Sequence, residues 1–225
     1  NTIGGFQPSV ETANNFSGNH RYGVEITGSA NHNSVFNSLI GVSDATGKAI
    51  PNAMGGVYLG PQTSYTTLGG AGRAMNQIVN NSGPGVVIQG ARRNVLQGND
   101  ISSNAVGGVK VVSAPGNQIG TSTAGNNISQ NAGNGLDLSG NVNGSQVQYN
   151  DIKNNAGSGV SVVGTRNLVI GGPLRSYGNN IVANRAYGII ASGYCGGTVL
   201  QNNTTVANGQ GSVNLTNSKG VQYIS

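Results

Sequence analysis

The sequence predicts an all-β parallel solenoid with three strands per turn and about eight turns, formed by residues 1–225 as a single domain. Three observations support this fold class. A short motif recurs eight times, each repeat holds three apolar segments of period two, and Asn and Gly dominate the remaining positions. Charged residues make up only 8% of the chain, against about a quarter in an average protein.

The most regular segment of the repeat is N-x-x-x-G-V-x-I. Its copies lie at 19–26, 52–59, 81–88, 104–111, 131–138, 155–162, 184–191 and 208–215. The leading Asn residues are 33, 29, 23, 27, 24, 29 and 24 positions apart. A motif that persists while its period drifts indicates one structural unit with loops of variable length. The two apolar positions of V-x-I are expected to point inward and to stack from turn to turn.

Two shorter segments complete each repeat. An N-x-I segment precedes the main motif in most copies, at 14–16, 76–78, 99–101, 126–128, 150–152 and 179–181. A third segment ends at an aliphatic residue, namely Ile3, Val35, Leu68, Leu96, Ile119, Val147, Val169 and Val199. Strands this short cannot form a stable sheet alone, but they pair with their equivalents when the turns stack about 4.8 Å apart. The period and the Asn and Gly content argue against helices.

The Asn residues fall into two registers that are expected to line two corners of the solenoid. One register contains Asn14, Asn37, Asn76, Asn99, Asn126, Asn150, Asn179 and Asn203. The other contains Asn19, Asn52, Asn81, Asn104, Asn131, Asn155, Asn184 and Asn208. Stacked amides can bond to one another as a ladder, and Asn tolerates the left-handed region. The Gly before V-x-I, which is replaced by Ser212 in the last copy, fits a position of positive φ or of close backbone approach.

Composition and charge exclude several classes of protein. The low charge and the steady supply of Val, Ile and Leu argue against disorder, and no stretch has the length of a membrane span. The net charge of +5 is not clustered in a basic run, so nucleic acid is not an expected partner. Cys195 is the only cysteine and is expected to be buried. We expect the chain, which opens within a motif (NTIGG), to be a segment of a longer protein.

The repeats, especially NNISQNAGNGLDLSGN and NDIKNNAGSGVSVVG, resemble the right-handed parallel β-helix repeats of the pectin-lyase-like superfamily. They are most similar to the Asn- and Gly-rich arrays of large secreted bacterial surface proteins. The resemblance covers the whole chain. It implies the fold but leaves the function open, because this superfamily includes polysaccharide lyases, hydrolases, mannuronan epimerases, phage tailspikes and non-enzymatic adhesins.

Few residues are candidates for catalysis. The acids are Glu11, Glu25, Asp44, Asp100, Asp137 and Asp151. Asp100 and Asp151 share an outward column with Asn127 between them, at a separation of roughly 9.6 Å. That value lies near the upper limit of the ~6.5–9.5 Å of an inverting glycosidase pair. Lys153, on the same face as Asp151, is expected to keep that carboxyl ionised. Asp100, Asp151 and Lys153 are therefore the candidates if the protein is an enzyme.

Other kinds of site have little support in the sequence. Lys110 and Asp137 are one turn apart and are expected to form a surface ion pair. His20 and His32 are expected in corners of different turns, with no carboxylate or Cys beside them, so no metal site is expected. The Asp-Pro-His signature of the epimerases does not occur. No Gly-rich phosphate motif opens a helix, so no cofactor is expected.

Loops and basic corners remain as candidate functional features. Insertions at 4–13, 69–75, 120–125 and 170–178 fall on alternate turns and are expected to line one edge. The candidate ligand-binding residues lie at corners: Arg92, Arg93 and Arg166, then Arg21 with Tyr22 and Arg185 with Tyr187 in equivalent positions of two turns. Lys219 and His32 lie near the first group. Solubility is the simpler role for these charges, and attraction of an anionic glycan is the more specific one.

The preferred hypothesis from the sequence is a non-catalytic, adhesive or glycan-contacting stalk of a secreted or surface bacterial protein. Its expected partner is an anionic polysaccharide or a cell-surface glycan. The alternative is a polysaccharide lyase or glycoside hydrolase of the same superfamily. Bare strand edges at the two ends of a short solenoid could also allow end-to-end self-association.

Overall fold

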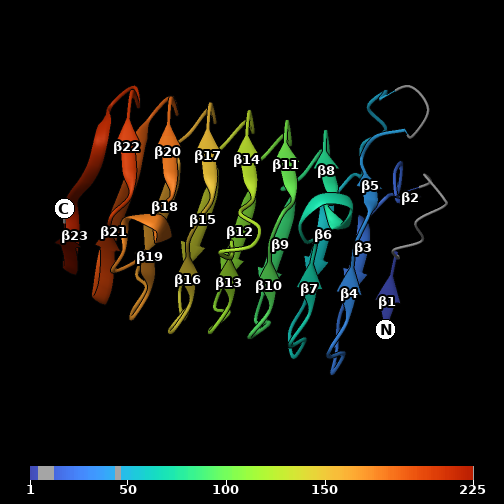
Figure 1. The fold of residues 1–225 in the computed structure, drawn as a ribbon, viewed down its shortest axis with the longest axis horizontal. Helices are drawn as coiled ribbons and strands as arrows, with labels where there is room; N and C mark the ends of the chain where they lie inside the picture. The colour runs from blue at the N-terminus through green and yellow to red at the C-terminus, as the bar shows by residue number, and fades with distance from the viewer. Residues whose placement is uncertain (5–12, 44–46, 225) are drawn as a thin grey trace.

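The computed structural model describes residues 1–4, 13–43 and 47–224, and its strands form a parallel solenoid with three strands in each turn (Figure 1). Every pairing between named strands is parallel, and each strand pairs with its equivalent in the next turn. β1 and β23 lie at opposite ends of the stack. The predicted fold class, including three strands per turn and about eight turns, is confirmed.

The three strands of a turn belong to three sheets, which we number in chain order. Sheet 1 contains β1 (Thr2–Ile3), β4 (Ser34–Val35), β7 (Thr67–Leu68), β10 (Val95–Leu96), β13 (Gln118–Ile119), β16 (Gln146–Val147) and β19 (Val169–Gly171). Sheet 2 contains β2 (Asn14–Asn15), β5 (Ser38–Ile40), β8 (Gln77–Val79), β11 (Asp100–Ser102), β14 (Asn127–Ser129), β17 (Asp151–Lys153), β20 (Asn180–Val182) and β22 (Thr204–Val206).

Sheet 3 is formed by the V-x-I segments. It contains β3 (Tyr22–Ile26), β6 (Gly55–Leu59), β9 (Val86–Gln89), β12 (Val109–Val112), β15 (Leu136–Ser139), β18 (Val160–Val163), β21 (Tyr187–Gln201) and β23 (Gly211–Ile224). β21 continues around the corner and also pairs with β19, so sheets 1 and 3 are joined at that turn.

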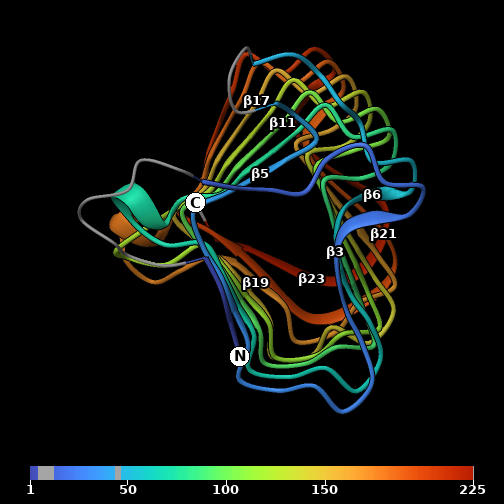
Figure 2. The same cartoon turned by 90° about the vertical axis from the view of Figure 1, so that its right-hand side faces the viewer.

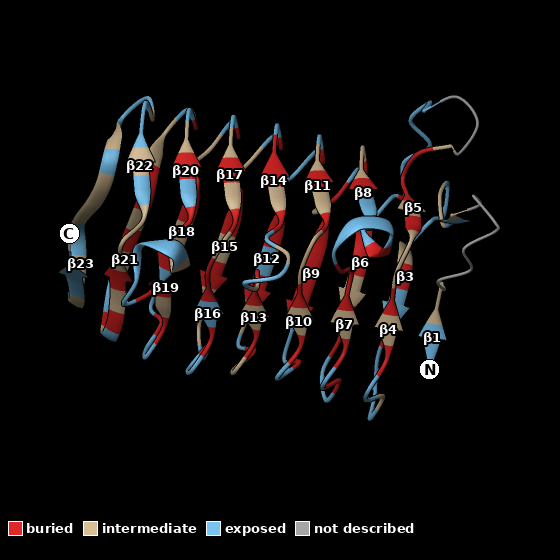
Figure 3. Cartoon of the chain, in the orientation of Figure 1, coloured by how far each residue is buried: buried red, intermediate tan, exposed pale blue. Residues whose placement is uncertain are grey.

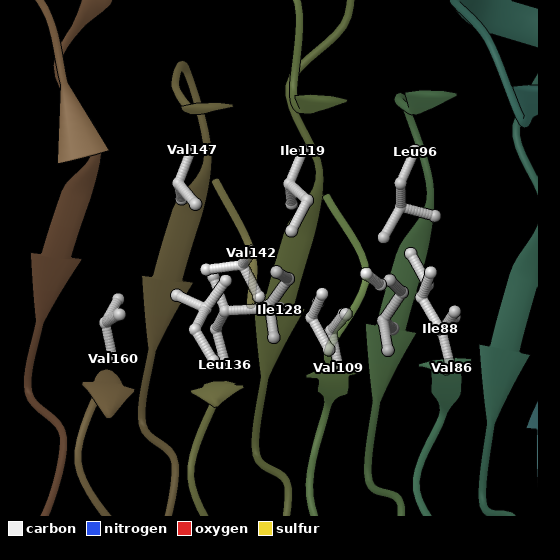
Figure 4. Packing of buried hydrophobic residues seen from close by; sticks show 14 of the residues in the cluster. Val86, Ile88, Leu96, Val109, Ile119, Ile128, Leu136, Val142, Val147 and Val160 are labelled. Atoms are coloured by element: carbon white, nitrogen blue, oxygen red, sulfur yellow. The ribbon is translucent and has the colours of Figure 1, made fainter. Parts of the chain in front are cut away.

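The core consists of columns of aliphatic side chains, one residue per turn, that run along the inside of the three sheets (Figures 3 and 4). Leu96, Ile119 and Val147 form part of such a column in sheet 1 and are at most 1% exposed. The sequence register was wrong by one residue in the next two turns. Ile170 and Leu200, not Val169 and Val199, continue the column, and both are fully buried.

Two Asn ladders line two corners of the solenoid. All eight members of the Asn19 to Asn208 register are joined by amide hydrogen bonds of 2.8–3.1 Å, as predicted. The other ladder runs from Asn76 to Asn203. The prediction that Asn37 belongs to this ladder is wrong. Ser38 occupies the ladder position, and the backbone N–H of Ser38 donates to Oδ1 of Asn76. Asn37 is instead the left-handed residue before it, with φ 46°.

A third, interrupted ladder, which the sequence analysis missed, lies at the corner between sheets 3 and 1. Asn1 donates to Asn33, and Asn94 donates to Asn117. Thr66 separates these two pairs. The Nδ2 of Asn33 and the Oγ1 of Thr66 are buried without a hydrogen-bond partner, so the interruption leaves two unsatisfied polar atoms inside the protein.

The roles expected of Asn and Gly at the corners are confirmed in part. The left-handed conformation falls on the residue before the ladder Asn, such as Gln130 before Asn131, and not on the ladder Asn itself. The Gly before V-x-I is needed for close approach. A Cβ on Gly135 would lie 2.6 Å from Ile152 Cγ2 and 2.7 Å from the carbonyl oxygen of Gly159.

The insertions between sheets 1 and 2 project from one edge of the solenoid (Figure 2). Two of them contain single 3₁₀ turns, η1 (Gly72–Ala74) and η2 (Arg175–Tyr177), where the sequence predicted no helix. Tyr177 of η2 packs against Tyr149 with 5.4 Å between ring centroids. Most of the predicted insertion 4–13 lies outside the described residues, as do Glu11 and Asp44.

Candidate functional site

The corner between sheets 3 and 1 carries the first group of predicted ligand-binding residues, and we call it the basic corner. Its successive turns are joined by backbone hydrogen bonds. The N–H of Arg93 donates to Pro115, that of Gly116 to Asn143, and that of Gly144 to Asn167. Arg92, Arg93 and Arg166 are all exposed on this corner. The structure therefore brings together the three arginines that the sequence placed there, over about three turns.

Arg93 is held by an aromatic residue of the preceding turn. Its guanidinium lies 5.7 Å from the centroid of the Tyr65 ring and donates a short hydrogen bond to the Tyr65 hydroxyl. His32, one turn earlier, stacks on the same ring with 4.9 Å between centroids and 10° between planes. Tyr65 thus lies between His32 and Arg93 along the solenoid axis. This arrangement fixes the position of the Arg93 charge.

Arg166 is held in the same way from the following turn. Its guanidinium lies 4.9 Å from the centroid of the Tyr194 ring. Tyr194 pairs in register with Lys219 of β23, so the corner continues with another cation in the last turn. A cation over an aromatic face at an exposed site gains about 0.5–1 kcal/mol, enough to favour one side-chain conformation.

Two hollows lie between these arginines. One, of about 290 Å³, is lined by Arg92, Arg93, Pro115, Gly116 and Asn143. The other, of about 380 Å³, is lined by Gly140, Asn141, Asn143, Gly164 and Arg166. Among the residues that the structure describes, no acidic residue lines either hollow.

Tyr65, Tyr194 and Asn143 were missed by the sequence analysis. A signal for Tyr65 was present, because it lies three residues before Leu68 just as Arg93 lies three residues before Leu96. Counting back from the aliphatic column therefore places these two side chains in neighbouring turns. The same count does not show that the Tyr65 ring and the Arg93 guanidinium face each other. Both residues have a left-handed backbone, with φ values of 53° and 55°, so the alternation of side chains along a strand does not apply to them.

The second predicted group, Arg21 with Tyr22, is engaged in contacts within the protein. Arg21 Nη2 lies 3.0 Å from Glu25 Oε1, and this hydrogen bond raises the pKa of Arg21 above its usual value. Tyr22 stacks on Tyr58 at 5.0 Å between centroids. Burial, followed by the neighbouring Tyr58, raises the pKa of Tyr22. The positive charge of Arg21 is therefore already compensated by Glu25.

Arg185 and Tyr187 form the third predicted group. Tyr187 occupies the same position of its turn as Tyr22, one residue before the Gly of the motif. Arg185 directly follows its ladder Asn, whereas Arg21 is two residues after Asn19. The prediction that these two arginines occupy equivalent positions is therefore wrong. Arg185 is exposed and lies just before β21, which is toward the opposite end of the solenoid from β3, the strand that Arg21 precedes (Figure 1).

The candidate catalytic residues lie on the outer face of sheet 2. Register pairing places Asp100, Asn127 and Asp151 in one outward column, as predicted. The Nδ2 of Asn127 donates to Asp100 at 2.9 Å, and that of Asn180 donates to Asp151 at 2.8 Å. Lys153 forms an ion pair with Asp151. Both partners of that pair are more than a third exposed.

The remaining candidates have structural roles. Lys110 and Asp137 are adjacent in register, but the predicted ion pair is wrong, because no Lys110–Asp137 pair occurs within the described residues and Asn134 donates to Asp137 at 2.7 Å. Cys195 is fully buried in the core, as predicted. The part of the chain that the structure describes has no group of three or more His, Cys, Asp or Glu side chains arranged to hold a metal ion.

Comparison of the sequence with protein families gives two overlapping matches. The profile of the right-handed β-helix region matches residues 12–172 and 55–224. The chain belongs to the right-handed β-helix family. No curated protein sequence matches this β-helix. Within the described residues, no helix has the length and apolar character that crossing a membrane requires.

Solved structures with a similar fold include a periplasmic alginate epimerase. The β-helix matches a crystal structure of the periplasmic alginate epimerase AlgG with a TM-score of 0.66 and 13% identity, over 87% of this chain and 46% of that one. A D317A variant of the same enzyme matches with a TM-score of 0.61 and 14% identity, over 87% of this chain and 48% of that one. The A-module of Azotobacter vinelandii mannuronan C-5 epimerase AlgE4 matches with a TM-score of only 0.41 and 13% identity, over 91% of this chain and 73% of that one.

These similarities establish the fold and no activity, because the sequence identities are so low. The β-helix spans about half the length of the AlgG chains that it matches.

Proposed function

We propose that this β-helix is a non-catalytic, glycan-contacting segment of a secreted or surface bacterial protein, and that it binds anionic polysaccharide through its basic corner. One observation carries the proposal. Arg92, Arg93 and Arg166 flank two hollows whose lining, within the described part of the chain, contains no acidic residue. A guanidinium recognises carboxylate and sulfate groups with paired hydrogen bonds, and these are the anionic groups of such polysaccharides.

The electrostatics of the corner favour a long anion over a small one. The exposed arginines lie on one line along the solenoid, so their potentials add over a ligand that follows that line. Arg21 contributes less, because Glu25 neutralises it. The similar fold of AlgG, an alginate epimerase by name, is compatible with a polysaccharide ligand but does not identify one.

Titration of the protein with alginate and with heparin at low salt tests the proposal, with neutral dextran as the control. We expect binding to both polyanions and none to dextran. The affinity should fall steeply with added salt, because the Debye length shortens from about 10 Å at 0.1 M to about 3 Å at 1 M. Absence of binding, or binding that is indifferent to salt, would overturn the proposal.

A polysaccharide lyase or glycoside hydrolase is the second candidate function, and the Asp100–Asp151 column favours it. The carboxyl groups are two strands apart, roughly 9.6 Å, which is near the spacing of an inverting pair. Lys153 and Asn180 already engage the carboxylate of Asp151, which disfavours a catalytic role for it. Assays for reducing ends and for unsaturated products on acidic and neutral glycans distinguish the two candidates.

End-to-end association is a further proposal for this β-helix. β23 is an edge strand along most of its length, and its residues Tyr223 and Ile224 are 55% and 44% exposed. An exposed edge of this length can pair with another strand. Sedimentation velocity over a range of concentrations tests this, and a single monomeric species at all concentrations contradicts it.

A further inference from the structure

We infer that the two hollows of the basic corner form one groove, and that this groove takes a linear anionic polysaccharide lying parallel to the solenoid axis across Asn143. This inference rests on the proposed function and adds the ligand's direction, its minimum length and a residue that determines specificity. Asn143 carries no charge, and nothing in the repeat pattern distinguishes it from the other exposed Asn residues.

The two hollows are continuous because they share a lining residue. Asn143 lines both hollows, the one with Arg92 and Arg93 and the one with Arg166. The backbone connects the same positions turn by turn, from Arg93 to Pro115, from Gly116 to Asn143 and from Gly144 to Asn167. Three turns separate the two ends, which corresponds to about 14 Å along the axis. Asn143 therefore lies between the two guanidinium ends, two turns from Arg93 and one turn from Arg166.

Each end of the groove has a guanidinium held in place before any ligand arrives. Tyr65 holds Arg93 by its ring and hydroxyl, and Tyr194 holds Arg166 by its ring. A side chain already restrained loses less conformational entropy on binding, so each contact contributes more to affinity. The two fixed charges act as separate anchors for one chain.

The minimum length follows from this separation. A ligand shorter than about 14 Å reaches one anchor only, whereas a longer chain reaches both and gains from the high effective concentration at the second. Between the anchors the groove floor is lined by small or uncharged residues, namely Pro115, Gly116, Gly140, Asn141, Asn143 and Gly164, which leaves an unbranched chain room to lie flat. A charge placed in that floor would lie beneath the middle of the ligand.

The aromatic residues favour a polysaccharide over single-stranded nucleic acid. Proteins bind single strands by stacking bases on free aromatic faces. Here the Tyr65 ring lies between His32 and Arg93, and Arg166 covers the Tyr194 ring. The Tyr65 ring therefore has a partner on each face, and Arg166 covers one face of the Tyr194 ring, so both rings already position cations.

The test compares two substitutions of equal charge. Asn143→Asp places a carboxylate in the groove floor, and Asn154→Asp places one at an exposed position of the corner between sheets 2 and 3. We expect Asn143→Asp to weaken binding of long alginate at low salt about threefold or more, and Asn154→Asp to have a smaller effect. Asn143→Lys should strengthen binding and Asn154→Lys should not, so a defect in folding cannot mimic the whole pattern.

A length series completes the experiment. Alginate oligomers longer than the groove should bind the parent protein more tightly than monomeric uronate at equal total charge, and Asn143→Asp should reduce this advantage. Equal effects of the substitutions at 143 and 154, or affinity independent of length, would overturn the inference and leave the proposed function standing. No binding of any alginate to the parent protein would overturn both. Single-stranded DNA bound as tightly as alginate of equal charge would overturn the choice of a polysaccharide.

Discussion

The side-chain amide of Asn131 donates to Oδ1 of Asn155 in the next turn at 3.0 Å, while its own Oδ1 accepts from the amide of Asn104 in the preceding turn at 3.1 Å. The same nitrogen also donates to the carbonyl of Ile101 at 3.0 Å. Asn131 is 1% exposed, so water cannot replace these bonds. A buried ladder of this kind converts Asn, a poor strand former, into a structural residue.

Replacement of Asn131 by Ala should therefore destabilise the protein by about 1–3 kcal/mol, because buried donors and acceptors of Asn104 and Ile101 lose their partners. Urea unfolding measures the change. Asn217→Ala is a suitable control, since Asn217 is exposed, and it should change stability by less than about 0.5 kcal/mol. If Asn131→Ala left the midpoint unchanged, the ladder would have no energetic role.

The interrupted ladder at the basic corner can be completed. Thr66 lies between Asn33 and Asn94, and its own backbone N–H already donates to Oδ1 of Asn94 at 2.9 Å. Thr66→Asn should give the unpaired Nδ2 of Asn33 an acceptor and stabilise the protein by about 1 kcal/mol. The urea midpoint should rise. A lower midpoint would mean that the larger side chain does not fit this fully buried position.

The fold could be predicted from the sequence because each turn repeats the same spacing, and errors arose where the spacing was ambiguous. Val169 and Ile170 are adjacent aliphatic residues, so period two alone could not select the inward one; pairing with Val147 selects Ile170. At Asn37 and Ser38 the need for a left-handed residue before the ladder position decided the register.

The candidate site could be predicted only in part. The positions of Arg92, Arg93 and Arg166 on one corner followed from the repeat. The contacts of Arg93 with Tyr65 and of Arg166 with Tyr194 could not be predicted, because side chains at this corner follow neither the alternation of a strand nor the spacing of the Asn ladders. The ion pair of Arg21 with Glu25 spans four residues across a turn into a strand, and the repeat gave no sign of it.

Gly135 and Gly144 are expected to resist substitution for different reasons, one because a side chain has no room and the other because its φ is positive. Gly135→Ala would place a Cβ 2.6 Å from Ile152 Cγ2 and 2.7 Å from a backbone oxygen, which should cost about 1–3 kcal/mol through overpacking. Gly144→Ala meets open space, but its φ of +72° is unfavourable for Ala by roughly 1 kcal/mol. Urea unfolding should show the larger loss for Gly135→Ala. The reverse order would contradict the close-approach role of this glycine column.

The Asp100→Asn and Asp151→Asn double variant tests the role of the carboxylate column. Stability should stay within about 0.5 kcal/mol, because Asp151 and Lys153 are too exposed for their ion pair to contribute much. Release of reducing ends or unsaturated products from glycans should be the same for the parent and the variant. Cleavage by the parent that disappears in a folded double variant would favour the enzyme over the stalk.

The cations of the basic corner are expected to bind the polyanion more strongly than cations elsewhere on the surface. Changing Arg92, Arg93 and Arg166 together to Ser should remove most of the affinity for alginate and heparin at low salt, because these charges act on one ligand from one corner. The matched control changes Arg21, Arg73 and Arg185 to Ser, which removes the same charge from other parts of the surface. Its effect should be smaller, because Glu25 already pairs with Arg21 and roughly 29 Å separate Arg21 from Arg185. Equal losses in the two triple variants would mean that net charge alone, and not the basic corner, attracts the polyanion.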